Sequence, residues 1–367
     1  MLAEPSPAPP LPPAIGTGQD GRAREAFFDN AKLPALVLVV CGHFWEPLAR
    51  QPGHRAVHAA YLLVYAFHMP VFVFVSGWFS RSFTARPHQV NRLIGGVLVP
   101  YLLWTTLLGR YTAWLNGRAF TLDLLTPAWV TWFLLSLFLW RLSAPLWRQL
   151  RAPITVAVAI ALLAGALPLT PQLSIGRTLQ FLPFFVAGLT LDRDKVLALR
   201  GNRALRIAAV PLFALAAVAA YRAVPRLDAA WLYRSMSATG LHSGYLRWAA
   251  LSLALGVAGA VLGAAFLALT PTRHAWFTAL GAAGMSAFLV HPFVQLALVH
   301  QGAYDGAFLA SAPGHLALTA GAAALALLLS TPPVARLLRP LLAPRLGLLL
   351  RRQSLSPEAG PPPARDR

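Results

Sequence analysis

Long apolar runs recur along most of the chain, and no other feature of the sequence constrains its fold as strongly. A membrane-spanning helix needs ~20 mostly apolar residues, and only 12% of this chain is charged, about half the share found in soluble domains. The sequence therefore predicts an all-α fold, a polytopic transmembrane helix bundle of about ten spans, and excludes a soluble enzyme or a secreted disulfide scaffold. The candidate spans lie at about residues 33–50, 59–80, 93–112, 125–141, 153–170, 176–191, 206–223, 247–270, 276–300 and 314–338.

The basic residues predict how these spans are oriented. The chain has 31 Lys and Arg against 12 Asp and Glu, a net charge of +19. If the N-terminus is cytoplasmic, 22 of the 31 basic residues fall on the cytoplasmic side, as the positive-inside rule requires, and both termini are cytoplasmic. The arginines lie between the apolar runs and form no separate basic domain. We therefore expect contacts with membrane lipids and no nucleic-acid partner.

The sequence divides into a membrane domain, residues 26–340, and two tails. Residues 1–25 are rich in proline and lack the basic start and apolar core of a signal peptide. Residues 341–367 are basic and end in a polar stretch, so we expect both tails to be disordered. The single cysteine, Cys41, excludes an intrachain disulfide. Because no Cys or His pair has metal-ligand spacing, we predict no metal site.

The first apolar run contains four ionisable side chains, Asp29, Lys32, His43 and Glu46. Ionisable groups are costly in lipid and indicate a functional site. Eleven helical steps of about 100° bring His43 to within roughly 20° of Lys32, about 16 Å farther along the helix. Glu46 lies one turn beyond His43, so the two side chains can touch. We expect Pro34 to occupy the first turn of this helix.

This spacing favours acid–base chemistry beside an anion site. Lys32 at the cytoplasmic mouth can bind an anionic cosubstrate, while His43 can take a proton from a hydroxyl group. Glu46 can orient the imidazole and stabilise its charged form, as a carboxylate does in a Ser-His-Asp triad. The alternative is structural, with Lys32 as an interface anchor and His43 as a hydrogen-bonded packing residue.

The second run and the segment after it add further candidates. His68 lies in the middle of the second run, and Gly77 near its end indicates close helix packing. Arg81 and Arg92 follow on the same side of the membrane as Lys32. For these arginines, the positive-inside rule and phosphate binding are both consistent with the sequence.

Two later runs contain aromatic and polar candidates. Trp132 lies in the fourth run, where an aromatic belt at the membrane interface also explains it. Ser286 and His291 lie in the ninth run. Because His291 directly precedes Pro292, a structural role at a helix kink and a role as a base are equally consistent with its position.

Six short motifs occur in the order typical of one known family. The first motif is DNAK followed by VVCGH, and the others are FHMPVFVFVSGWFSR, LVPYLLW, WFLLSLFLW, FLPFFVAG and SAFLVHP. Together they resemble the acyltransferase-3 family of integral membrane O-acyltransferases, most closely its fucose 4-O-acetylase-like branch. The resemblance covers about residues 27–340. It implies a ten-helix core that transfers an acyl group, usually acetyl from cytoplasmic acetyl-CoA. The acceptor is a hydroxyl of a carbohydrate, a lipid-linked glycan or a small metabolite.

The resemblance also implies roles for individual residues. The family's paired basic residue and histidine correspond to Lys32 and His43, and its late histidine to His291. Its basic residues after the second span correspond to Arg81 and Arg92. We therefore expect catalytic roles for His43, Glu46 and His291, and binding of the CoA phosphates by Lys32, Arg81 and Arg92. The residues that we expect to contact the acceptor substrate are Asp29, Asn30, His68, Trp132 and Ser286.

Two other functions are less consistent with the sequence. A transporter or glycan exporter could use the same intramembrane charges, but the halves of the chain show no self-similarity of the kind common in transporters. A structural subunit of an envelope complex does not explain the Lys32, His43 and Glu46 stripe. The chain lacks the extracytoplasmic hydrolase-like domain of larger family members. We therefore expect separate glycan-assembly partners, and a location in the cytoplasmic membrane of a bacterium.

Overall fold

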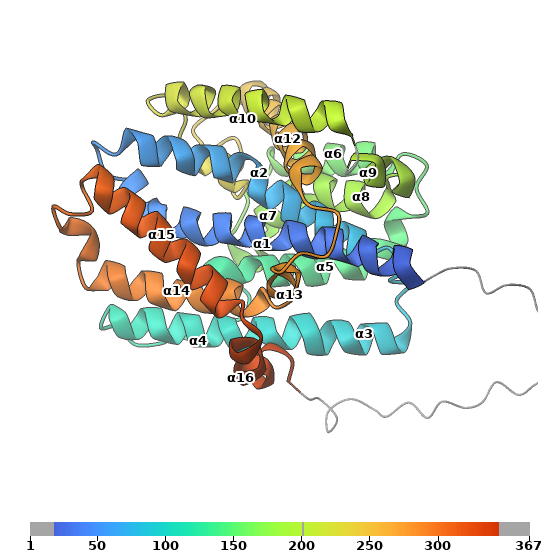
Figure 1. Ribbon diagram of the computed structural model, residues 1–367, viewed down its shortest axis with the longest axis horizontal. Coiled ribbons are helices and arrows are strands. Elements are labelled where there is room, and N and C mark those ends of the chain that lie inside the picture. The colour runs from blue at the N-terminus through green and yellow to red at the C-terminus, as the bar shows by residue number, and fades with distance from the viewer. Residues whose placement is uncertain (1–17, 200–201, 345–367) are drawn as a thin grey trace, which may run out of the picture.

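The computed structural model describes residues 18–199 and 202–344, and all regular secondary structure in these two ranges is helical (Figure 1). The first helices are α1 (Gly18–Ala49), α2 (Arg55–Phe79), α3 (Pro87–Leu93), the π-helical turn η1 (Ile94–Leu98) and α4 (Val99–Leu115). They are followed by η2 (Trp129–Thr131), α5 (Trp132–Trp147), α6 (Pro153–Ala164), η3 (Gln172–Ser174), α7 (Ile175–Gln180), α8 (Leu182–Thr190) and α9 (Arg193–Leu199). The last are α10 (Arg203–Ala223), α11 (Ala230–Tyr233), α12 (Tyr245–Leu269), α13 (Thr278–Ala282), α14 (Met285–His300), η4 (Ala303–Asp305), α15 (Ala312–Leu329) and α16 (Pro332–Leu342).

Each of the ten apolar runs forms a helix or two successive helices. Among the described residues, seven helical segments are long and apolar enough to cross a membrane, while α6 and α14 are apolar but shorter. The run at 176–191 divides into α7 and α8 just before Pro183, which cannot donate a backbone hydrogen bond. The predicted all-α transmembrane bundle is confirmed, and the protein is a multi-pass membrane protein. Ten spans and cytoplasmic termini stay predictions.

Helix α1 differs from our expectation at its start. It begins at Gly18, so residues 18–25, which we assigned to the N-terminal tail, are helical and Pro34 lies in the helix interior rather than in its first turn. An interior proline costs about 3 kcal/mol, but Phe27, Phe28 and Ala31 before it are almost completely buried, and this packing holds the helix together. The rest of the predicted tails, residues 1–17 and 345–367, lies outside the described residues, and α16 continues to Leu342.

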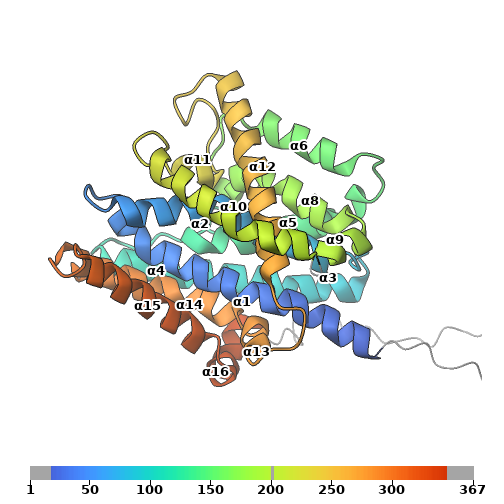
Figure 2. The same ribbon diagram turned by 45° about the horizontal axis from the view of Figure 1, so that its top comes forward.

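Helices α1 and α2 form the centre of the bundle. Helix α1 packs against α2, α13, α14 and α15, while α2 packs against α8, α10 and α12 as well. Figures 1 and 2 show α1 and α2 running side by side, with α10 and α12 on one side and α14 and α15 on the other. The central position explains why ionisable side chains on α1 are shielded from lipid.

Two glycines bring the backbones of α2 and α8 into contact. A Cβ atom on Gly77 would lie 2.0 Å from the carbonyl oxygen of Phe185, and one on Gly188 would lie 2.0 Å from that of Phe74. The close approach predicted for Gly77 is therefore confirmed. Arg81, just after α2, donates from Nε to the Gly188 carbonyl oxygen at 2.9 Å and so binds the end of α8.

The first testable prediction concerns the orientation of the bundle. Arg148 near the end of α5 donates to the carbonyl oxygens of Phe83 and Ser80 after α2, so basic ends of α2 and α5 lie together. The positive-inside rule places this end in the cytoplasm. We expect a fluorescent reporter fused after Arg367 to be active and alkaline phosphatase at the same position to be inactive. When the same two reporters are inserted in the loop at residues 116–128, we expect the phosphatase to be active and the fluorescent reporter to be inactive. An active phosphatase after Arg367 would contradict the even number of spans.

Candidate active site

His43 on α1 and His291 on α14 form a direct pair inside the bundle. Nδ1 of His43 lies 2.7 Å from Nε2 of His291, and the two rings are stacked with centroids 5.0 Å apart. The residues are 248 positions apart in the chain. Both were expected as catalytic residues, and the structure brings them together.

The partner of His291 determines which nitrogen of His43 can act as a base. Nδ1 of His291 lies 2.8 Å from the Ala287 carbonyl oxygen, and a carbonyl oxygen only accepts hydrogen bonds. Nδ1 of His291 therefore carries the proton, and in the neutral ring its Nε2 is the acceptor. His43 must then donate from Nδ1 to this acceptor. The lone pair of neutral His43 is consequently on Nε2, which is the nitrogen available to a substrate.

His43 lines a cavity of about 210 Å³ between α1, α2, α5 and α7. His68 and Trp132, both expected to contact substrate, line the same cavity. Nδ1 of His68 donates to the Val64 carbonyl oxygen at 2.7 Å, so its Nε2 is an acceptor in the neutral ring. Trp129 covers the imidazole of His43 at 4.9 Å between ring centroids. We call this space the histidine cavity.

Backbone strain marks the position of Trp129. Its φ of 42° is in the left-handed region, which costs roughly 1–2 kcal/mol for a residue with a side chain. Such strain is characteristic of functional sites. The sequence does not single out Trp129, because the strain comes from tertiary structure and has no signature in the sequence.

Glu46 does not contact His43 as we expected. It lines the histidine cavity but forms an ion pair with Arg50, one turn farther along α1. A carboxylate is attracted more strongly by a permanent cation four residues away than by a neutral imidazole. The expectation that Glu46 orients His43 is therefore wrong in this structure, and His291 makes the orienting contact instead.

The histidine cavity also contains an arginine that our sequence interpretation missed. Arg177 lines this cavity, and its guanidinium lies 5.2 Å from the ring centroid of Trp132. The sequence did contain a signal for Arg177, because an arginine within an apolar run is costly in lipid, as is the histidine of the first run. It provides the cavity with a permanent positive charge.

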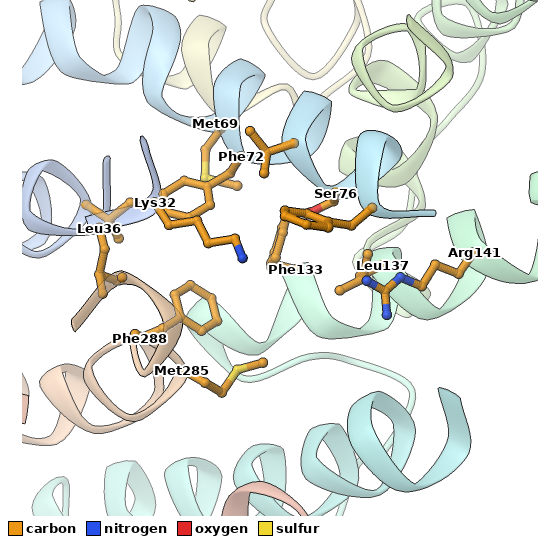
Figure 3. A pocket seen from close by; sticks show the side chains of 15 residues that line it. Lys32, Leu36, Met69, Phe72, Ser76, Phe133, Leu137, Arg141, Met285 and Phe288 are labelled. Carbon is orange, nitrogen blue, oxygen red and sulfur yellow. The ribbon is translucent and has the colours of Figure 1, made fainter. Parts of the chain in front are cut away.

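A larger cavity of about 500 Å³ lies beside the histidine cavity, toward the Lys32 end of α1. Figure 3 shows Lys32 and Arg141 pointing toward this space, with Phe72, Phe133 and Met285 among the apolar side chains around it. Lys32 also pairs with Asp29, at 2.8 Å from Nζ to Oδ1. We call this space the lysine cavity, because Lys32 and Arg141 are the basic residues among those that line it.

Three side chains separate the lysine cavity from the histidine cavity. Val39, Met69 and Phe288 line both spaces, and we call them the septum. Along α1, Val39 lies between Lys32 and His43 on the same helix face, as the helical spacing predicted. The common face of Lys32 and His43 is therefore confirmed.

Arg81 and Arg92 do not lie with Lys32. The guanidinium of Arg81 donates to the carbonyl oxygens of Gly188 and Leu191 at the end of α8, and stacks 3.9 Å from the Trp78 ring centroid. Arg92 is exposed on α3. Neither lines the lysine cavity. Arg141 of α5 lines this cavity together with Lys32, as Arg81 and Arg92 were expected to do. The sequence does not indicate which of these arginine side chains points into the bundle.

Two other expected substrate contacts are occupied by backbone. The buried Asn30 amide donates to the carbonyl oxygens of Pro271 and Arg273, at 2.9 and 2.8 Å, and accepts from Thr278 at 2.6 Å. The Ser286 hydroxyl is buried within hydrogen-bond distance of the carbonyls of Ala283 and Leu329. Because these groups hold α13 and α15 in place, neither is free to bind substrate.

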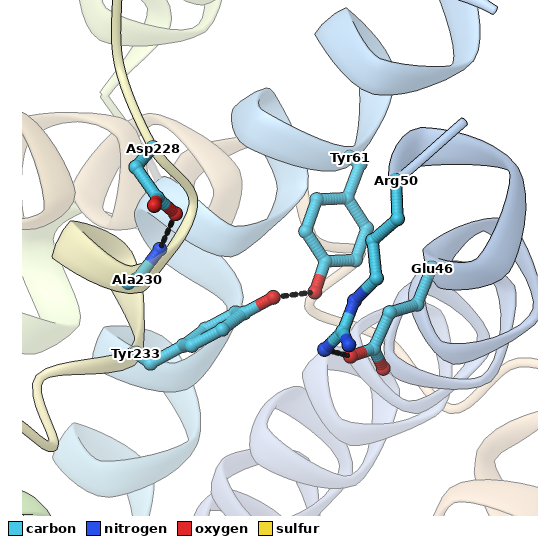
Figure 4. Close-up of polar contacts among 6 residues, drawn as sticks. All are labelled: Glu46, Arg50, Tyr61, Asp228, Ala230 and Tyr233. Carbon is cyan, nitrogen blue, oxygen red and sulfur yellow. Dashed lines mark hydrogen bonds and ion pairs between the residues drawn. The ribbon is translucent and has the colours of Figure 1, made fainter. Parts of the chain in front are cut away.

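A third cavity, of about 610 Å³, adjoins the histidine cavity on the side away from Lys32. Arg50 and Tyr233 line both spaces. Figure 4 shows a hydrogen bond between the hydroxyl groups of Tyr233 and Tyr61, beside the Glu46–Arg50 pair. The two hydroxyl oxygens are 2.6 Å apart. Polar side chains such as His58, Arg226 and Asp228 line this outer cavity.

Comparison with known protein families identifies most of the chain. A family model described as an acyltransferase domain matches residues 25–331, a range that includes α2 to α15 and both paired histidines. No curated protein and no solved structure matches the chain. Within residues 18–199 and 202–344, no three His, Cys, Asp or Glu side chains form a group able to hold a metal ion.

Proposed function

Because this chain belongs to the acyltransferase-3 family, and is therefore a membrane acyltransferase, we propose that it transfers an acetyl group from cytoplasmic acetyl-CoA to a hydroxyl of a carbohydrate or glycan. The observation that supports this proposal is the position of His43. Its ring lies in a cavity separated by only three side chains from a second cavity that has basic residues in its wall.

The lysine cavity has the chemistry that a CoA thioester needs. CoA has phosphate groups at one end and a long, weakly polar arm that ends in the thioester. Lys32 and Arg141 can bind the phosphates through charge-assisted hydrogen bonds, while the apolar side chains of Phe72 and Phe133 contact the arm. This arrangement would bring the thioester to the septum, next to His43.

The reaction follows from the free nitrogen of His43. Nε2 takes the proton of the acceptor hydroxyl while the hydroxyl oxygen forms a bond to the thioester carbonyl carbon. The tetrahedral intermediate then collapses, the C–S bond breaks, and the protonated imidazole returns its proton to the departing thiolate. His291 acts as a positioning residue that holds the reactive tautomer. Arg177 supplies positive charge beside the oxygen on which negative charge develops.

The acceptor would reach His43 from the outer cavity. His58, Arg226 and Asp228 offer hydrogen-bond donors and acceptors of the kind that bind sugar hydroxyls. In the predicted orientation this cavity faces the extracytoplasmic side of a bacterial cytoplasmic membrane. A lipid-linked glycan and a small metabolite are both suitable acceptors, and glycan-assembly proteins are the expected partners.

The donor site gives the second prediction. We expect Lys32→Ala and Arg141→Ala each to raise the KM for acetyl-CoA about ten- to a hundred-fold, because one charge-assisted contact contributes roughly 1.5–3 kcal/mol. Arg92→Ala is the matched control, since Arg92 is exposed and lies outside the cavity. The measurement is release of free CoA thiol by membranes that contain the protein, with varied acetyl-CoA. An equal increase in KM for Arg92→Ala would support the phosphate-binding role of Arg92 that the resemblance implies, and would contradict its replacement by Arg141.

A transporter is the second candidate, because three cavities that share walls adjoin one another along α1. A transporter moves its substrate into vesicles without acetyl-CoA and without releasing CoA. Acceptor-dependent CoA release that is absent from vector-only membranes supports the acyltransferase. Uptake of a labelled sugar without any such release would support the transporter.

A further inference from the structure

A fourth cavity, of about 310 Å³, lies between α6, α8 and α12, away from the row of cavities along α1. Figure 2 shows α6 and α12 on the same side of the bundle. Its volume is at the lower end of the range for small-molecule sites. Most of its wall consists of hydrocarbon side chains, including Val158 of α6, Phe184 of α8 and Leu253 of α12.

The cavity faces the lipid side of the bundle. Leu253 and Val257 of its α12 wall are 43% and 63% exposed, and both lie within a helix that is long and apolar enough to span the membrane. The surface of such a helix that protein does not cover is in contact with lipid acyl chains. A hydrocarbon chain can therefore enter the cavity from the bilayer.

One permanent charge lies in this apolar wall. Arg234, directly after α11, lines the cavity and donates from Nη2 to the Ser252 carbonyl oxygen at 3.2 Å. Its guanidinium lies 5.7 Å from the ring centroids of Phe181 and Phe184. Within the described residues, no carboxylate lies at ion-pair distance from Arg234. A guanidinium has five N–H donors, so most of them are available to an anion.

The backbone at Arg234 supports a role for its side chain. Its φ of 50° and ψ of 36° are in the left-handed region, where glycine has no steric cost and arginine does. A residue held in this conformation indicates a functional constraint. Phe181 also lines the histidine cavity, so Arg234 lies one side chain away from it.

We propose that this cavity binds a membrane phospholipid, with the phosphate on Arg234 and one acyl chain along α12. From Ser252, which accepts a hydrogen bond from Arg234, the cavity lining continues along α12 to Ala260, about 12 Å of helix. One leaflet of a bilayer contributes about half of a ~30 Å hydrocarbon core, so one acyl chain has a suitable length. The fork of an arginine binds two phosphate oxygens at once. This inference does not depend on the acyl-transfer reaction.

The test is retention of phosphatidylglycerol by the purified full-length protein in detergent, measured by native mass spectrometry. We expect Arg234→Gln to lower the affinity about ten-fold or more, since it removes the charge-assisted contact. Arg247→Gln is the matched control, because Arg247 is exposed on α12, which forms part of the cavity wall, but does not itself line the cavity. Unchanged retention by Arg234→Gln, or an equal loss with Arg247→Gln, would overturn the proposal.

A second variant tests the acyl-chain part without removing the charge. A Cβ on Gly256 would already lie 3.3 Å from Nη2 of Arg234, so the variant is Ala260→Leu, which narrows the cavity one turn farther along α12. We expect this variant to retain less phosphatidylglycerol and to lose the increase in melting temperature that the lipid gives the wild type. If millimolar inorganic phosphate displaces the lipid from the wild type, the site binds free phosphate, and the proposed role of the acyl chain is wrong.

Discussion

Replacing His43 with Gln is expected to lower the rate of acyl transfer about a hundred-fold or more, which is within the usual range for a lost general base. Gln keeps similar size and hydrogen-bonding capacity, but it cannot accept a proton near neutral pH. The structure makes this prediction specific to one nitrogen, because Nδ1 of His43 is bound to His291 and only Nε2 is available. The measurement is the rate of acceptor-dependent CoA release at saturating acetyl-CoA, normalised to folded protein.

Two variants of His291 distinguish a base from a positioning residue. In His291→Gln, the amide can still donate to the Ala287 carbonyl and accept from His43, so we expect partial activity. His291→Ala should lose more activity than His291→Gln, because nothing then fixes the His43 tautomer. The control is His300→Gln, which changes an exposed histidine on the same helix. Normal turnover in His43→Gln together with an inactive His291→Gln would show that the base is His291.

Replacing Gly188 or Gly77 with Ala is expected to remove most of the folded protein. A methyl group 2.0 Å from a backbone oxygen cannot be accommodated by a side-chain rotation, so α2 and α8 must move apart. Overpacking typically costs 1–3 kcal/mol and occasionally more, and we expect about 3 kcal/mol or more here because the contact is backbone to backbone. The separation would also break the Arg81–Gly188 hydrogen bond. The measurements are the yield of monodisperse protein in detergent and its melting temperature.

Gly321→Ala is the matched control for this prediction. Gly321 lies in α15, and nothing lies within 4 Å of the position that an added methyl group would occupy. Alanine is the better helix former by about 1 kcal/mol, so this variant should be as stable as the wild type or slightly more. If Gly188→Ala matched Gly321→Ala in yield and melting temperature, the close contact of α2 and α8 would not exist in the membrane.

The features that depend on one helix could be predicted from the sequence. Apolar runs predicted that each long helix of the described ranges exists, although α1 begins at Gly18, before its run, because hydrophobic length has a direct meaning in a bilayer. The common face of Lys32 and His43 followed from helical geometry alone. Gly77 was recognised as a site of close packing because small residues let helix backbones approach.

The features that depend on two helices could not be predicted in this way. The partner of His43 is 248 residues away, and the sequence offered the nearby Glu46 instead. Arg141, rather than Arg81, lines the cavity with Lys32, because Arg81 is bound to the end of α8. Asn30 looked like a substrate ligand, but its hydrogen-bond partners belong to the start of α13 and the segment before it. Helix rotation and distant packing decide these contacts, and neither has a local signal.

The narrow septum has a consequence for the energy metabolism of the cell. Cavities in a row along a central helix shorten the barrier between the two sides of the membrane. A membrane potential of 100 mV drives each elementary charge across that barrier with about 2.3 kcal/mol. Val39, Met69 and Phe288 separate the lysine cavity from the histidine cavity. In the proposed reaction the acyl group crosses this septum, so the same three side chains would also have to prevent a proton leak. An opening in the septum large enough for a long acyl chain would also let protons through, so under the proposed mechanism the barrier function of the membrane would favour a small acyl group.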